Sequence, residues 1–133
     1  MVVQKTIQLL LNQLVEGNPV KISIDGSDLM IRYFNPESKI LISTSIYQGD
    51  NYIPGSVRHC INHKAPFSQM NMLTYISVDE KEFRIKLNYA GHEDFLSKEN
   101  LTLLLEEFGS LAEKWRLYLD EHDKRDLIYV RVK

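Results

Sequence analysis

Residues 101–119 read LTLLLEEFGSLAEKWRLYL, and this stretch decides how the rest of the chain must pack. Its apolar residues recur every three or four positions for about five turns, which predicts a long amphipathic helix. Ser97 is a suitable N-cap for this helix. The apolar stripe comprises Leu101, Leu104, Leu105, Phe108, Leu111, Ala112, Trp115 and Leu119. A stripe of this width must be buried against another layer of the fold.

The part of the chain before this helix alternates apolar and polar residues as strands do. Runs at 20–24, 28–34 and 39–47 predict a three-stranded antiparallel meander, and Asp25-Gly26-Ser27 predicts its first turn. Successive side chains of a strand point to opposite faces. The second run is predicted to place Leu29, Ile31 and Tyr33 on one face and Met30, Arg32 and Phe34 on the other. The third is predicted to place Ile40, Ile42, Thr44 and Ile46 opposite Leu41, Ser43, Ser45 and Tyr47.

Three further elements complete the predicted order. Residues 3–16 have helical apolar spacing, and Gly17-Asn18-Pro19 ends that helix. Residues 56–63 predict a short middle helix, and residues 73–78 and 83–89 predict a second hairpin. The fold class is therefore α+β, with a twisted antiparallel sheet packed by helices, in the order helix, three strands, helix, two strands, helix. We expect one domain over 1–121 and a charged tail at 122–133, in which Leu127–Val132 favour an extra strand.

The charge of the chain is small and unevenly distributed. A length of 133 residues with 44% apolar content suits one hydrophobic core, and the formal net charge is −2. Residues 93–126 contain 10 acidic and 5 basic residues, so the last helix is acidic and the remainder carries +3. A field this weak does not concentrate nucleic acid or an anionic membrane, so we expect neither as a partner.

Cysteine usage and the N-terminal sequence both predict a cytoplasmic protein. Cys60 is the only cysteine, so the chain forms no internal disulfide. Residues 1–16 lack the continuous apolar core of a secretory signal, since Gln8, Asn12 and Gln13 interrupt it. No apolar run approaches the roughly 20 residues that a membrane span requires.

One cluster of residues invites a chemical function. His59, Cys60 and His63 fall within the predicted middle helix, where histidines four positions apart share a face and could bind a metal. The glutamate that follows the first histidine of the metalloprotease motif is missing, and a lone cysteine is more often a small buried residue. We therefore expect no catalytic residue, no metal and no cofactor, and keep a small enzyme or metal protein only as a third reading.

The order of elements resembles that of the class I type III secretion chaperones. The residues that carry the resemblance are the leucine-rich opening Ile7-Gln8-Leu9-Leu10-Leu11, the meander from Val20 to Ile46, and Phe108-Gly109-Ser110-Leu111-Ala112-Glu113-Lys114-Trp115. The resemblance spans about residues 3–121. It implies a cytoplasmic homodimer that binds the N-terminal segment of a secreted effector protein without catalysis and keeps it competent for export. A chaperone-fold adaptor or regulator that binds another cytoplasmic protein is the second reading.

The resemblance also implies which residues meet partners. It places the effector segment on Leu9, Leu10, Met30, Phe34 and Leu41. It places the dimer interface on the middle helix and the strand after it, at Val57, Cys60, Ile61, Leu73 and Tyr75. The apolar residues on both faces of the meander are compatible with such a groove. They are equally compatible with cover by the chain's own helices, and the sequence leaves these two explanations open.

Overall fold

The structure is a computed structural model that describes residues 9, 12–14, 16–24, 26–34, 39–62, 74–92 and 98–132. Its elements are β1 (Val20–Ile24), β2 (Ser27–Phe34), β3 (Lys39–Gln48), α2 (Gly55–Ile61), β4 (Thr74–Asp79), β5 (Arg84–His92) and α3 (Lys98–Val132). This is the predicted α+β class with the predicted order of elements. Most of the helix predicted at 3–16 lies outside the described residues, although Leu9 and residues 12–14 are helical.

The five strands form one antiparallel sheet in the order β1-β2-β3-β5-β4. The first hairpin turns at Gly26, whose φ of +79° favours glycine, as the sequence predicted. The second hairpin turns later than predicted, at Glu80–Phe83, because the carboxylate of Asp79 accepts hydrogen bonds from the amides of Lys81 and Glu82. Phe83 therefore lies in the turn and not in β5, with a φ of +56°.

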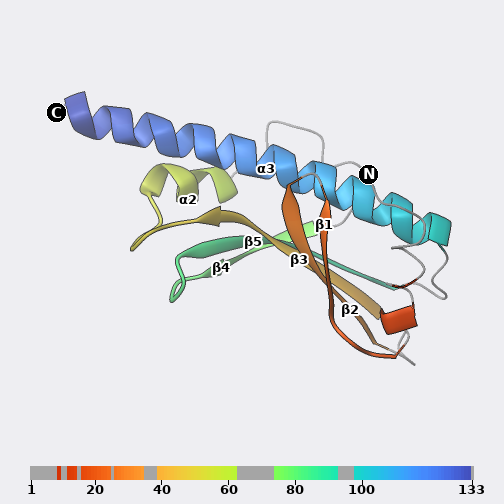
Figure 1. The fold of residues 1–133 in the computed structure, drawn as a ribbon. Coiled ribbons are helices and arrows are strands. Elements are labelled where there is room, and N and C mark those ends of the chain that lie inside the picture. The colour runs from red at the N-terminus through yellow and green to blue at the C-terminus, as the bar shows by residue number, and fades with distance from the viewer. Residues whose placement is uncertain are drawn as a thin grey trace.

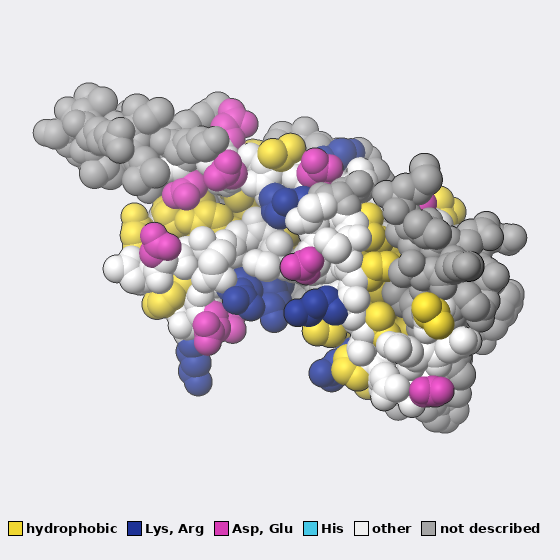
Figure 2. Space-filling view, in the orientation of Figure 1, with side chains coloured by type: hydrophobic (Ala, Val, Ile, Leu, Met, Phe, Trp, Pro, Cys, Tyr) yellow, Lys and Arg dark blue, Asp and Glu magenta, His cyan; other side chains and the backbone are white. Residues whose placement is uncertain are grey.

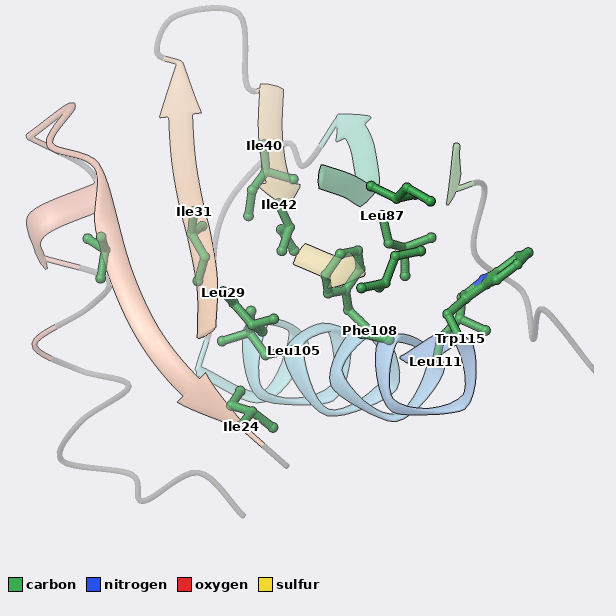
Figure 3. Close-up of a cluster of buried hydrophobic side chains, with 14 of the residues drawn as sticks. Ile24, Leu29, Ile31, Ile40, Ile42, Leu87, Leu105, Phe108, Leu111 and Trp115 are labelled. Carbon is green, nitrogen blue, oxygen red and sulfur yellow. The ribbon is translucent and has the colours of Figure 1, made fainter. Parts of the chain in front are cut away.

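Helix α3 covers one face of this sheet (Figure 1), and α2 packs beside it. Figure 3 shows Leu105, Phe108 and Leu111 of α3 pointing toward the sheet residues Leu29, Ile31, Ile40, Ile42 and Leu87. The Phe108 side chain is 0% exposed, and it lies among these strand residues. Dense packing of this kind supplies most of the stability of a small domain. The predicted apolar stripe of 101–119 is thus the inner layer of the core.

A β-bulge in β3 places Tyr47 on the other face of the sheet from the one predicted. The pairing with β5 shifts register between Ser45 and Tyr47, so that Tyr47 lies opposite the buried Ile85. A bulge inserts one extra residue into a strand, and side chains beyond it change faces. Tyr47 therefore points to the side of α3, whereas strict alternation had placed it on the opposite face.

The C-terminal residues correct a second prediction. Leu127–Val132 belong to α3 and not to an extra strand, because the helix continues through Val132. The preceding residues, 120–126, contain no glycine or proline that would end a helix. Adding a turn to an existing helix needs no partner, whereas a strand needs a free sheet edge beside it.

Packing of α3 on the sheet can be tested with one core and one surface substitution. We expect Phe108→Ala to lower the free energy of unfolding by about 3–5 kcal/mol, because it leaves a cavity between the two layers. Leu117→Ala, on the same helix but 64% exposed, should change it by less than about 0.5 kcal/mol. Urea unfolding followed by circular dichroism measures both. Equal losses for the two variants would contradict the placement of the stripe.

Candidate partner-binding surface

The outer face of the sheet, opposite α3, is open in the described part of the chain. We define it by the residues of β1, β2 and β3 that alternate with the core residues, namely Lys21, Ser23, Asp28, Met30, Arg32, Phe34, Lys39, Leu41, Ser43 and Ser45. Two large apolar side chains on it remain exposed, Met30 at 37% and Phe34 at 39%. In Figure 2 yellow apolar side chains appear between the dark-blue basic side chains over the sheet.

The apolar residues of the outer face lie beside a shallow hollow. Its volume is about 140 Å³, and its lining includes Met30, Arg32, Leu41, Tyr75 and Asn88. Tyr75 and Asn88 pair directly across β4 and β5, and the amide of Asn88 donates a hydrogen bond to the backbone carbonyl of Tyr75. A hollow near 150 Å³ holds about one ring-sized apolar group. The outer face can therefore accept single side chains of another molecule.

The predicted partner-binding residues mostly share this surface. Met30, Phe34 and Leu41 all lie on the outer face, on two adjacent strands. Leu9 is exposed, and Leu10 lies outside the described residues. Among the described residues, α2 and α3 leave both Met30 and Phe34 exposed, which favours the first of the two explanations that the sequence left open.

The residues predicted for a dimer interface are divided by the structure. Val57 and Cys60 are 0% and 1% exposed, because α2 turns them toward α3 and the core of the same chain. Tyr118 of α3 makes a side-chain hydrogen bond with Cys60. Side chains this deeply buried have no surface to offer a second copy, so both are removed from the predicted interface. Ile61 is half-buried, Tyr75 is 54% exposed, and Leu73 lies outside the described residues.

The histidine and cysteine cluster does not converge within the described residues. His59 is exposed while Cys60 is buried, so the two side chains leave α2 in different directions. His63 lies outside the described residues. Among the residues that are described, no three His, Cys, Asp or Glu side chains are close enough to hold a metal ion.

A second hollow was missed by sequence reasoning. It lies between the end of β3 and the C-terminal half of α3, has a volume of about 420 Å³, and is lined by Ser45, Ile46, Tyr47, Gln48, Arg116, Leu117, Asp120 and Asp123. The side chains of Tyr47 and Asp123 both line this hollow and lie close together. Burial raises the pKa of Tyr47 well above its ordinary value of 10.0, and the neighbouring Asp123 raises it further. The bulge that brings Tyr47 here depends on the pairing with β5, which the sequence of β3 alone does not reveal.

Comparison with solved structures identifies the fold. The chain superimposes on the type III secretion chaperone ExsC in the crystal structure of the ExsC-ExsE complex with a TM-score of 0.58, covering 89% of this chain and 96% of that one at 14% identity. It also matches the chaperone SpcU in the heterodimeric ExoU-SpcU complex of Pseudomonas aeruginosa, with a TM-score of 0.54 and 13% identity, over 86% of this chain and 95% of that one. The fold is that of the class I secretion chaperones.

Sequence comparisons add nothing to this assignment, because no protein-family model and no curated protein matches the chain. The resemblance noted in the sequence is therefore confirmed for the fold, at low sequence identity. No helix among the described residues is long and apolar enough to cross a membrane.

The contact between Tyr47 and Asp123 predicts a pH-dependent stability. We expect Tyr47→Phe to lower the free energy of unfolding at pH 7 by up to about 1.5 kcal/mol, because it removes a partly buried hydroxyl close to Asp123. Because the pKa of Tyr47 is higher in the folded state than its ordinary value of 10.0, the protonated hydroxyl stabilises the fold fully below pH 10. That stabilisation is lost as the pH rises toward the folded-state pKa. The difference in the free energy of unfolding between the wild type and Tyr47→Phe should therefore become smaller above about pH 10.

Urea unfolding at pH 7 and at about pH 10.5 measures this gap. Tyr52→Phe is the matched control, because Tyr52 is exposed near Tyr47 and Asp50 and should give the same small difference at both pH values. A gap for Tyr47→Phe that is constant with pH would contradict the contact with Asp123.

Proposed function

We propose that the chain is a non-catalytic, cytoplasmic type III secretion chaperone that binds the N-terminal segment of a secreted effector and keeps it competent for export. The observation that carries this proposal is the exposure of Met30 and Phe34 on the outer face of a sheet with the secretion-chaperone fold. Exposed apolar residues that cluster on one surface are typical of protein-binding sites.

An extended segment is the partner that fits this surface best. Apolar side chains that alternate along a strand can enter shallow hollows, while the backbone of the segment pairs with a sheet edge. Within the described residues β1 pairs on one side only, with β2, and it lies next to Met30. A segment that pairs with the β1 edge and then continues across the outer face would reach Met30, Leu41 and Phe34 without any change in the core. Segments that are unfolded before binding can wrap surfaces of this kind.

The proposal includes a homodimer. Exposed Tyr75 on edge strand β4 and half-buried Ile61 on α2 are the remaining described residues that can form its interface. β4 lies at the opposite edge of the sheet from β1. A second copy on β4 therefore leaves the β1 edge free for the effector segment. Symmetric dimers commonly join through identical surfaces of this kind.

Capture of the partner from the protein's own cells tests the function. We expect the tagged chain to retain a specific secreted protein, bound through a segment near the partner's N-terminus. Met30→Asp combined with Phe34→Asp should reduce the captured amount at least about tenfold, because it places charges where apolar anchors are buried. Mass spectrometry of the eluate and limited proteolysis of the complex give the readout.

Leu103→Asp combined with Leu117→Asp is the matched control, because both leucines are exposed on α3, away from the outer face. It should capture as much partner as the wild type. Recovery of a regulatory protein that is not secreted would favour the adaptor reading. Equal capture by both double variants would show that the outer face is not the binding surface.

The dimer is tested by light scattering at tens of micromolar. We expect the mass of two chains for the wild type and a lower mass for Tyr75→Glu, since a charge there would be buried against its own copy. Tyr52→Glu, which changes an equally exposed tyrosine outside β4, should leave the mass unchanged. A monomeric wild type would contradict this part of the proposal.

A further inference from the structure

Each apolar residue proposed to bind the partner on the outer face has a basic residue directly opposite on the neighbouring strand. The pairs are Lys21 with Met30, Arg32 with Leu41, and Lys39 with Phe34. Directly opposed side chains on one face of an antiparallel sheet lie about 5 Å apart at Cβ. We call these six residues the paired patch. In this patch a positively charged side chain lies beside each of the three apolar residues.

The charges of the paired patch are not neutralised within the described chain. Strands β1, β2 and β3 contain three basic residues and one acidic residue, Asp28. The ion pair found among the described residues, between Arg58 and Glu80, lies elsewhere, on α2 and the β4–β5 turn. No described carboxylate approaches Lys21, Arg32 or Lys39 within 4.0 Å. As far as the described residues show, the patch is therefore free to pair with charges of another molecule.

A group of acidic residues lies on the opposite layer, on α3. Residues 101–123 of α3 contain six acidic and two basic residues. Figure 2 shows most of the dark-blue side chains over the sheet, below α3, and several magenta side chains along α3. The two layers of the fold thus differ in sign, although the net charge is only −2. An acidic segment would be repelled by α3 and attracted to the outer face.

We propose that the paired patch selects an acidic segment, in which carboxylates stand next to apolar side chains. This inference rests on the proposed function, and it names the chemistry of the partner segment. Carboxylates of the segment pair with Lys21, Arg32 and Lys39. Its apolar side chains cover Met30, Leu41 and Phe34. Complementary charge fixes the register and rejects basic segments, while apolar burial supplies affinity.

Two other ligands could occupy the paired patch, and the test distinguishes them from an acidic segment. The acidic α3 of a second copy would satisfy the same charges, and so would the phosphates of a single-stranded nucleic acid stacked on Phe34. A second copy docked in this way joins unlike surfaces and gives a ring or an open chain of molecules larger than a dimer. Either would bind to the same basic residues, so the test includes both.

The experiment measures binding of short fluorescein-labelled peptides by fluorescence anisotropy. The probes are one peptide of alternating Glu and Leu with Ser spacers, a second with Lys in place of Glu, a third with Gln, and a single-stranded RNA. We expect the Glu peptide to bind at least about tenfold more tightly than the Gln peptide and to weaken as salt is added. The Lys peptide should bind most weakly.

Charge reversal locates the site. Lys21→Glu combined with Arg32→Glu should weaken the Glu peptide at least about tenfold. Lys21→Arg combined with Arg32→Lys keeps both positive charges and should bind the Glu peptide like the wild type. Lys81→Glu combined with Lys114→Glu has the same net charge but alters residues outside the paired patch, so it should bind like the wild type. All substituted residues lie outside β4, but Arg32 lines the same hollow as Tyr75, so light scattering of each variant must show that its mass is unchanged.

Equal binding of the Glu and Lys peptides, or equal loss in both charge-reversed variants, would overturn the inference. Tighter binding of the RNA would overturn it in favour of a nucleic acid. Light scattering that shows concentration-dependent chains, abolished by Lys21→Glu with Arg32→Glu, would assign the patch to a second copy. If cellular capture depends on Met30 and Phe34 but not on Lys21 and Arg32, this inference fails while the proposed function stands. If capture fails for the wild type, the proposed function itself fails.

Discussion

Burial of the apolar stripe of α3 against one face of the sheet is the constraint on which the rest of the structure depends. Phe108, Leu105 and Leu111 meet the inner residues of β2, β3 and β5, and all three are fully buried. A single helix of this length covers one face of a five-stranded sheet, because a sheet has two faces and a helix has one stripe. The opposite face is left to solvent in the described chain, so one packing contact determines both the core and the proposed binding surface.

The open face explains residues that would otherwise weaken a small protein. Met30 and Phe34 contribute little to the core, yet both are large and apolar and stand next to basic side chains. Cross-strand neighbours of unlike chemistry stabilise a sheet weakly by themselves. They are better suited to a molecule that brings carboxylates and apolar groups together. The surface chemistry of the outer face is therefore compatible with the proposed binding of a partner segment.

The sequence predicted the parts of the fold that depend on local periodicity. Alternation in β2 correctly separated Leu29, Ile31 and Tyr33 from Met30, Arg32 and Phe34, because strand geometry alone fixes the two faces. Features that depend on a partner element were not predictable. The bulge at Tyr47 depends on the register with β5. The burial of Val57 and Cys60 depends on α3 passing beside α2. Whether Met30 was covered could be decided only once the position of α3 was known.

Thiol reactivity in the free protein and in its complex measures whether the outer face becomes covered. In a Cys60→Ala background, Met30→Cys reports on the outer face and Leu117→Cys on α3. We expect a maleimide to modify both quickly in the free protein, because both positions are exposed. In the complex with the captured partner, Met30→Cys should react at least about tenfold more slowly, since a side chain at the centre of an interface is shielded from solvent, while Leu117→Cys keeps its rate. Unchanged reactivity of Met30→Cys, or protection of Leu117→Cys instead, would contradict a partner on the outer face.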